Sequence, residues 1–596
     1  MSTAARWLAI VALVAAPAAL AQSPAKILRV TFAAAETGFD PVRTHDYYSG
    51  TILEAIFDTL LTYDYLARPA KLVPNAAAEM PKISADGLTY TLRIRKGIYF
   101  ADDPVFKGAK RELAAQDFAY SIRRFFDPKN RSPYAFLFTG KIAGMEELAA
   151  RAKGGARFDY DAPVAGLQTP DRYTLVIRLT RRDRNFAHVL AFPVVGAVAR
   201  EVIEAYGDDV ASHPVGSGPF YLKRYVRSSK IVLAANPGYR GKVWDFDPGT
   251  NERFRRIAER MRGKRLPVID GVEVSVIEET QSRWLAFQRG DTDIEYQLAE
   301  LAPTFITDDG KLKPELARRG IQLDRSIDPE ITYLYFNMQE RIGDAPNPVG
   351  GFSKEHLALR RAIAMAYNID DEIRIIRKGQ AVRAHYPIPP GVAGHDPNYV
   401  SSIPYDPRAA NVLLERYGYK KGEDGYRRQP NGAPLVIRYA SSPTERDRQF
   451  DELMKRGMDA IGLRMEIQKE RFPELLKLEK QCRLMMHQAA WIADWPDGDN
   501  FMQLLYGPNI HESNNACYQS AEYDRRYEKS RTLPDGPQRD RLYHEMTRLI
   551  EVDTVWLLTD SRYRNALQQP YVVGYAKHPV LHAEWLYLDL DPRPAH

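Results

Sequence analysis

The chain of 596 residues is too long for a single hydrophobic core, so its length predicts about three or four domain-sized units. Apolar residues make up 44% of the chain and charged residues 27%, which is ordinary for a globular protein. The formal net charge of +6 is small for this length and gives no support for a polyanionic partner, so we expect no nucleic-acid binding.

The first 21 residues have the features of a secretory signal peptide. Arg6 precedes a short apolar run, and the run ends in the small-x-small sequence Ala19-Leu20-Ala21. The next residue is Gln22 rather than a cysteine that could carry a lipid, so we expect a secreted protein without a lipid anchor. No later stretch has about 18 consecutive apolar residues, which excludes transmembrane helices from the prediction.

Apolar patterns predict a mixture of strands and helices in the first half of the chain. The strand candidates are residues 27–33, 89–95, 173–179, 229–234 and 271–277. A helix is expected after the turn Gly38-Phe39-Asp40-Pro41, because apolar residues then recur at helical spacing. These apolar residues are Ile52, Leu53, Ile56, Leu60 and Leu61. No regular βαβ repeat is present, which argues against a single Rossmann or barrel sheet.

The second half of the chain resembles another α/β unit. A helix is predicted through Leu359–Ala366, and a second begins at Asp406 with Pro407 in its first turn and ends at Gly418. Residues 435–439 and 463–468 are strand candidates that flank a further helix. Because no low-complexity linker separates these segments, we expect interwoven domains.

Seven basic residues lie between Thr250 and Arg265. Glu252 and Glu259 are interleaved with them, and no ladder of aromatic residues accompanies them. This pattern favours a solvated surface insertion over a nucleic-acid-binding segment.

The sequence contains none of the common catalytic or cofactor motifs. There is no GxSxG, no HExxH and no Walker phosphate loop, and Val215-Gly216-Ser217-Gly218-Pro219 lacks the third glycine of a dinucleotide fingerprint. The twelve histidines have no metal-ligand spacing. We therefore expect a protein without enzymatic activity, cofactor or metal. The two cysteines, Cys482 and Cys517, are compatible with one disulfide or with two buried thiols.

The segment from Trp491 to Phe501 places three carboxylates among aromatic rings. Its spacing lacks the ligand order of a calcium loop, and a catalytic pair of Asp494 with Asp497 has no sugar-binding context to support it. One interpretation is that Asp494 lies in an aromatic cleft and binds an ammonium group of a ligand, because a ligand without the amine would leave a buried charge unpaired. The alternative is that Asp494 caps a turn among core tryptophans.

Ordered sequence blocks carry a resemblance to a known family, the extracellular solute-binding proteins of ABC importers, in their peptide, nickel and oligopeptide-binding group. The blocks are residues 39–41, 54–60, 86–95, 113–121, 214–220, 289–293, 360–363 and 387–391, and the tryptophan-rich segment at 491–501. The resemblance implies an α/β, two-lobed periplasmic-binding-protein fold with an extra subdomain in the first lobe and a hinged ligand cleft. It divides the chain into a signal peptide (1–21), a discontinuous domain I (22–66, 196–325 and 557–596), an inserted domain II (67–195) and a second lobe, domain III (326–556).

The same resemblance implies a function and a set of ligand-binding residues. A periplasmic protein of this kind captures a short peptide by lobe closure and delivers it to a membrane permease, as a monomer. The residues implied are Asp494 for the ligand amine, with Trp491, Trp495, Tyr296, Gln297 and Tyr335 around the cleft. The alternatives are a non-peptide solute (a metal chelate, haem, an opine or an oligosaccharide), a secreted hydrolase that uses Asp494 and Asp497, and a chaperone-like surface role.

Overall fold

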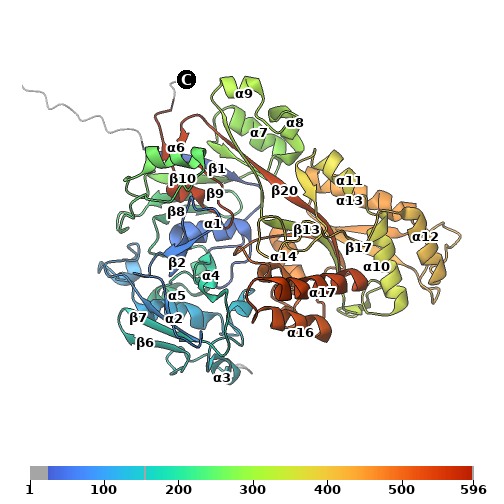
Figure 1. The fold of residues 1–596 in the computed structure, drawn as a ribbon, viewed down its shortest axis with the longest axis horizontal. Helices are drawn as coiled ribbons and strands as arrows, with labels where there is room; N and C mark the ends of the chain where they lie inside the picture. The colour runs from blue at the N-terminus through green and yellow to red at the C-terminus, as the bar shows by residue number, and fades with distance from the viewer. Residues whose placement is uncertain (1–24, 153–155, 594–596) are drawn as a thin grey trace, which may run out of the picture.

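A computed structural model describes residues 25–152 and 156–593 of the chain (Figure 1). The predicted signal peptide, residues 1–21, lies outside these described residues. Within the described ranges, no helix has both the length and the apolar character that crossing a bilayer requires.

The first lobe contains one half of a twelve-stranded sheet. Strand β1 pairs in parallel with β10, so that Val30 lies beside Val274, and β9 and β8 continue the sheet in antiparallel fashion. In the first four residues of β1 and of β9, buried side chains alternate with half-buried ones, as expected when one face of a sheet packs on a core. The bounds are Ile27–Phe32 for β1, Phe220–Val226 for β8, Lys230–Ala235 for β9 and Gly271–Val276 for β10.

The second lobe contains the other half of this sheet. Its central strand, β13, is buried along its whole length and pairs with β19, while β17 lies between β19 and β18. The strands are β13 (Glu330–Phe336), β17 (Val436–Ser441), β18 (Arg464–Lys469) and β19 (Met486–Ile492). The helices are α10 (Lys354–Ala366), α12 (Pro407–Arg416), α13 (Glu445–Ala460) and α14 (Phe472–Lys480). The predicted helices and strands of this second α/β unit are therefore present.

One long strand, β20 (Trp556–Gln568), joins the two half-sheets. Its first residues pair with β13, and its last six pair with β12 (Gln322–Ile327). Its end also pairs with β11 (Ile294–Glu295), which in turn lies beside β1. Figure 1 shows β20 running from one lobe into the other. The boundary expected at residue 557 falls at the start of this strand, whereas the crossing between the half-sheets lies within it.

A separate four-stranded sheet forms a subdomain of the first lobe. Its strand order is β4-β5-β7-β6, and Tyr90 of β5 lies opposite Ile177 of β7. Helix α2 (Ala115–Arg124) packs against β6 and β7. Figure 1 places β6 and β7 on the side of the molecule away from β17. The bounds are Lys82–Ile83, Thr89–Arg93, Leu167–Asp171 and Thr174–Arg178 for β4 to β7.

The first predicted helix is shorter than expected, and the predicted basic insertion contains a helix. Helix α1 (Tyr47–Ile56) begins at Asp46, whose carboxylate accepts the Ser49 N–H, but it ends before Leu60 and Leu61. Leu61 starts β2 (Leu61–Tyr63), so its burial reflects a strand rather than another helical turn. The predicted basic insertion contains helix α6 (Glu252–Met261), where Arg256 and Arg260 form ion pairs with carboxylates.

Candidate functional site

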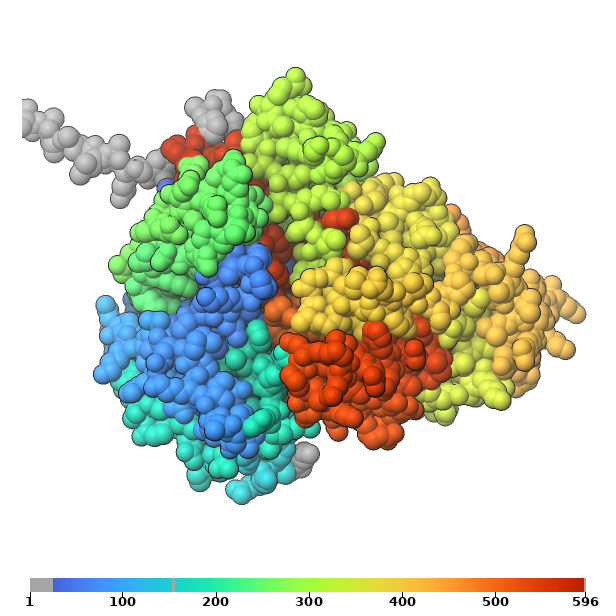
Figure 2. All heavy atoms as spheres, in the orientation of Figure 1, coloured from blue at the N-terminus to red at the C-terminus, as the bar shows by residue number. Residues whose placement is uncertain are grey.

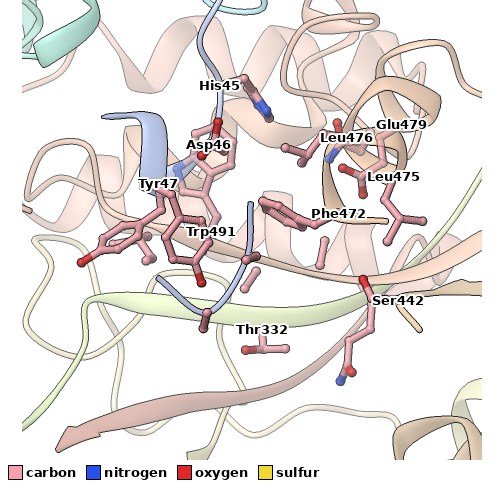
Figure 3. A pocket seen from close by; sticks show the side chains of 18 of the residues that line it. His45, Asp46, Tyr47, Thr332, Ser442, Phe472, Leu475, Leu476, Glu479 and Trp491 are labelled. Carbon is pink, nitrogen blue, oxygen red and sulfur yellow. The ribbon is translucent and has the colours of Figure 1, made fainter. Parts of the chain in front are cut away.

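A cavity of about 310 Å³ lies between the two lobes. Its walls come from the segment after β1, the loops around Tyr134 and Pro193, and the second-lobe elements β13, α13, α14 and β19. In the space-filling view, the two lobes meet across a hollow (Figure 2), and Figure 3 shows side chains of both lobes facing the same space. The volume is at the lower end of the range for small-ligand pockets, about 300–1,000 Å³, which favours a short ligand.

Asp494 lines this cavity directly after β19, and Asn500 holds its side chain in place. The Asn500 amide donates to Asp494 Oδ2 at 2.9 Å, while its Oδ1 accepts the Asp494 backbone N–H at 2.9 Å and the Trp491 indole N–H at 3.0 Å. Asp494 is 9% exposed. Burial raises the pKa of Asp494 from 3.8 to about 7, and the Asn500 hydrogen bond offsets only part of this effect.

Asp494 differs from the two other carboxylates of its segment. Asp497 accepts hydrogen bonds from Arg539 at 2.5 and 2.7 Å, and Asp499 lies 3.8 Å from Arg531. Burial opposes ionisation of Asp497, but Arg539 outweighs it and lowers the pKa of Asp497. In the described ranges, 25–152 and 156–593, no lysine or arginine forms an ion pair with Asp494. Asp494 is therefore the carboxylate of this segment that can take a cation from outside.

Two other predicted residues, Trp491 and Gln297, also line the cavity. Trp491 presents its ring to the cavity while its indole N–H is bound to Asn500. Gln297 has a φ of 65° and accepts a hydrogen bond from the Tyr48 hydroxyl at 3.1 Å. Together with Asp494, they come from both lobes, so the structure brings these three predicted residues around one space.

The structure places Trp495, Tyr296 and Tyr335 outside the cavity lining, each buried in the protein. Tyr296 packs its ring against the Arg564 guanidinium, 5.3 Å from the ring centroid. The Tyr335 hydroxyl lies close to Glu479, and burial and this carboxylate together raise the pKa of Tyr335 well above its usual value. These aromatic residues are buried next to the cavity walls and do not line the cavity.

Three polar residues of the lining, His45, Arg446 and Glu479, are not singled out by any sequence motif. Both His45 ring nitrogens are buried without a hydrogen-bond partner among the described residues, and burial lowers the pKa of this imidazole. The Arg446 Nε is 3.6 Å from Asp447 and 3.9 Å from Glu300. His45, Arg446 and Glu479 come from three separate segments, so only the folded chain brings them together.

Polar contacts connect the lobes beside the cavity. Asp183 of the first lobe lies 2.9 Å from Arg531 of the second lobe, and Lys141 approaches the same carboxylate at 2.9 Å. The Asn185 amide donates to Asp497 at 3.1 Å. All these side chains are at most 10% exposed, so polar groups of both lobes are buried against each other in the described conformation.

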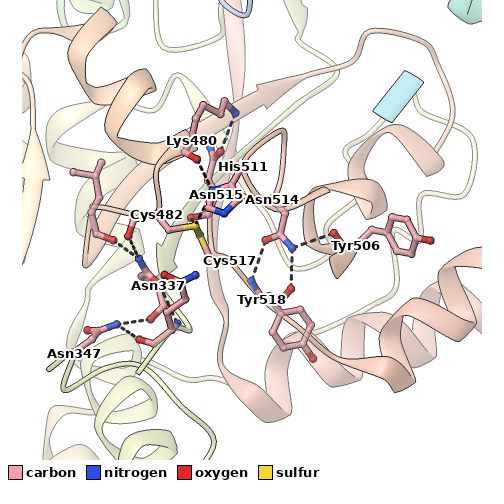
Figure 4. Close-up of a disulfide and its surroundings, with 12 residues drawn as sticks. Asn337, Asn347, Lys480, Cys482, Tyr506, His511, Asn514, Asn515, Cys517 and Tyr518 are labelled. Carbon is pink, nitrogen blue, oxygen red and sulfur yellow. Dashed lines mark hydrogen bonds between the residues drawn. A yellow bond between two sulfur atoms is a disulfide. The ribbon is translucent and has the colours of Figure 1, made fainter. Parts of the chain in front are cut away.

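The structure joins Cys482 and Cys517 in a disulfide with a Cα separation of 6.2 Å (Figure 4). Next to it, Lys480 donates to the Asn515 side chain at 3.0 Å, and Asn337 donates to the Cys482 carbonyl at 2.8 Å. The disulfide therefore ties the end of α14 to the loop that carries Asn515. No cluster of three or more potential metal ligands occurs in the part of the chain that the structure describes.

Comparisons with known proteins agree with this architecture. The family of bacterial extracellular solute-binding proteins, family 5, matches residues 71–512. The chain is 28% identical to Di/tripeptide-binding protein 2 of Pseudomonas aeruginosa, over 97% of each chain. It is 24% identical to Heme-binding protein A of Haemophilus influenzae, over 85% of this chain and 82% of that protein.

Among solved structures, the periplasmic binding protein DppA of Helicobacter pylori, in complex with the peptide STSA, is similar with a TM-score of 0.75. It is 22% identical, and the match covers 95% of this chain and 98% of that one. The two-lobed α/β fold expected from the sequence is thus confirmed. The chain belongs to the bacterial extracellular solute-binding proteins of family 5.

Proposed function

We propose that this protein is the periplasmic, monomeric, non-enzymatic binding component of an ABC importer, and that it captures short peptides and delivers them to a membrane permease. The observation that carries the proposal is Asp494, a buried carboxylate without an ion-pair partner in the described part of the chain, at the wall of an interlobe cavity. A ligand ammonium group would neutralise it. In a water-poor cavity such a pair is selective, because a ligand without the amine leaves the charge unpaired.

Arg446 supports the choice of a peptide, since a peptide also carries a carboxylate. Two other arginines of the lining, Arg377 and Arg562, are neutralised by buried carboxylates of the protein. Arg446 has only the longer contacts to Asp447 and Glu300, and its side chain is 38% exposed. A peptide with its amine at Asp494 and its carboxylate toward Arg446 would match the charges of both ends of a short zwitterion.

The domain division expected from the sequence suggests how capture occurs. In this proposal the lobes rotate about β20 and the link between β12 and β13, where the chain passes between the half-sheets. A peptide that contacts both lobes binds the closed form better than the open form, so it shifts the population toward closure. Trp495, Tyr296 and Tyr335 would then act by supporting the walls of the cleft.

The alternative within the family is a non-peptide ligand. Haem is the most specific candidate, because one relative is named a heme-binding protein. His45 and His487 lie in the lining and could approach a metal. The lining also holds the carboxylates Asp494 and Glu479, which would repel the propionates of haem. Charge complementarity therefore favours a ligand with an ammonium group.

The experiment is native mass spectrometry of the gently purified protein, followed by calorimetric titration with Ala-Ala, Ala-Ala-Ala, haem, an opine and a maltooligosaccharide. We expect a bound mass of two or three amino acid residues and saturable heat with the peptides alone. Binding of haem, the opine or the sugar without binding of either peptide would contradict the proposal. A hydrolase would instead reveal itself by cleaved peptide in the same samples.

A further inference from the structure

One wall of the cavity combines apolar side chains with a buried carboxylate. Helix α14 turns Leu475, Leu476 and Glu479 toward the cavity, because positions i, i+1 and i+4 share one helix face. Figure 3 shows these side chains next to one another. We call this wall, together with His487 of β19, the Glu479 subsite.

The Glu479 carboxylate is buried without a lysine or arginine as its ion-pair partner among the described residues. Glu479 is 3% exposed, and the Tyr335 hydroxyl lies close to its carboxylate. Burying a carboxylate without a cationic partner costs free energy. Because Glu479 lines the cavity, a cation that arrives with the ligand would neutralise this carboxylate.

The neighbouring basic residues make no hydrogen bond to the Glu479 carboxylate. Lys480 is adjacent in sequence but donates to Asn515 at 3.0 Å and is not part of the lining. The His487 Nε2 atom is 3.8 Å from Glu479 Oε1, beyond hydrogen-bond distance, and its Nδ1 donates to the Ala440 carbonyl at 2.8 Å. The Tyr335 hydroxyl lies close to the carboxylate, but it carries no positive charge and Tyr335 does not line the cavity.

We propose that the Glu479 subsite recognises a cationic side chain of the bound peptide, of the lysine or arginine type, and so makes the protein selective for basic peptides. The inference rests on the proposed function. The methylene chain of such a residue would lie along Leu475 and Leu476, and its charged head would reach Glu479. Long basic side chains commonly combine an apolar contact along the stem with a polar contact at the tip. An acidic side chain would meet a like charge.

The test compares peptides that differ only in the charge of one side chain. The probes are Lys-Ala, Ala-Lys and Ala-Lys-Ala, each with its norleucine and glutamate counterparts, measured by isothermal titration calorimetry. For the position that occupies the subsite, we expect lysine to bind at least about tenfold tighter than norleucine, and glutamate to bind weakest. The substitution Glu479→Gln should abolish the advantage of lysine and leave the affinity for the norleucine peptide within about threefold.

Glu512→Gln is the matched control. Glu512 is another half-buried carboxylate near Lys480, but it does not line the cavity and accepts the Phe136 backbone N–H at 2.6 Å. This variant should keep the lysine preference. Equal affinity for lysine and norleucine peptides at every position in the unsubstituted protein would overturn the subsite, even if Glu479→Gln failed to fold. Failure of every peptide to bind a folded protein would instead overturn the proposed function.

Discussion

Asn500 and Asp494 are joined by two hydrogen bonds, one from the Asn500 amide to the carboxylate and one from the Asp494 backbone to the Asn500 carbonyl. The same Asn500 carbonyl accepts the Trp491 indole N–H. Asn500 thus fixes two cavity residues at once, although it does not line the cavity itself.

The first prediction concerns this positioning. Asn500→Ala removes three hydrogen bonds among buried groups, so we expect a loss of about 1–3 kcal/mol in the free energy of unfolding and at least about tenfold weaker peptide binding. Urea denaturation and calorimetric titration measure the two effects. Asn509→Ala, which removes buried hydrogen bonds to Gln503 away from the lining, should reduce stability while sparing affinity. A normal affinity in Asn500→Ala would show that Asp494 needs no such support.

The second prediction is the pH dependence of peptide affinity. Asp494 has its pKa raised to about 7 by burial in the ligand-free cavity, whereas pairing with an ammonium group requires the ionised form. Below pH 7, binding must therefore release a proton from Asp494, and affinity should rise as the pH rises toward 7. Above about pH 8 the ligand α-amine loses its own proton and affinity should fall.

Titrations from pH 5.5 to 9 in buffers of different ionisation enthalpy measure this proton release. Asp494→Asn should remove the acidic limb of the profile. A profile that is flat between pH 5.5 and 7 in the unsubstituted protein would contradict the assignment of Asp494 to the amine.

The third prediction concerns the contacts that hold the lobes together. Burial opposes the ionisation of Asp183, but Lys141 and Arg531 outweigh it and lower the pKa of Asp183. Asp183→Asn removes the carboxylate that Lys141 and Arg531 share in the closed form and leaves Arg531 only the 3.8 Å contact with Asp499, which should favour the open form. We expect a larger radius of gyration without ligand in X-ray scattering and at least about tenfold weaker peptide binding.

The matched control is the exposed pair between the lobes, Arg184 with Asp535, whose side chains are 31% and 60% exposed. Because solvent-exposed ion pairs contribute little, Arg184→Gln should change affinity by less than about threefold. Equal effects of the buried and exposed substitutions would argue against a specific role of Asp183 in closure.

The fourth prediction concerns the disulfide. Cys482 and Cys517 are 35 residues apart in sequence, so their bond restricts the unfolded chain by about 3–4 kcal/mol in a loop-entropy treatment. Cys482→Ser combined with Cys517→Ser should lower the free energy of unfolding by about that amount in urea titrations. Reductant should have the same effect on the unsubstituted protein and no effect on the double variant. Insensitivity of the unsubstituted protein to reductant would contradict a structural disulfide.

Local signals predicted much of the fold. Asp406 caps α12 by accepting the Ala409 N–H, as the Asp-Pro sequence indicates, and the strand candidates of both halves are present. The predicted end of α1 was wrong. Leu60 and Leu61 continue the helical spacing of apolar residues, but the helix ends at Ile56 and Leu61 begins β2. Tertiary packing, not local propensity, decides where that helix stops.

The site could be predicted only in part. Asp494 and Trp491 stand out because they belong to a short aromatic segment, and both line the cavity. Tyr296 and Gln297 show the limit of this reasoning, since adjacent residues point in different directions and only Gln297 reaches the lining. Glu479 lies in an ordinary amphipathic helix, and its position against β19 follows from long-range packing that no local pattern encodes.

The most direct test is a comparison of one peptide with its N-acetylated form on the unsubstituted protein and on Asp494→Asn. If Asp494 binds the ligand ammonium group, the unsubstituted protein should prefer the free amine by at least about 30-fold, as expected for breaking a buried charge pair worth about 2 kcal/mol or more. Asp494→Asn should bind both forms with similar affinity. Equal binding of both forms by the unsubstituted protein, or an undiminished preference in the variant, would contradict the account.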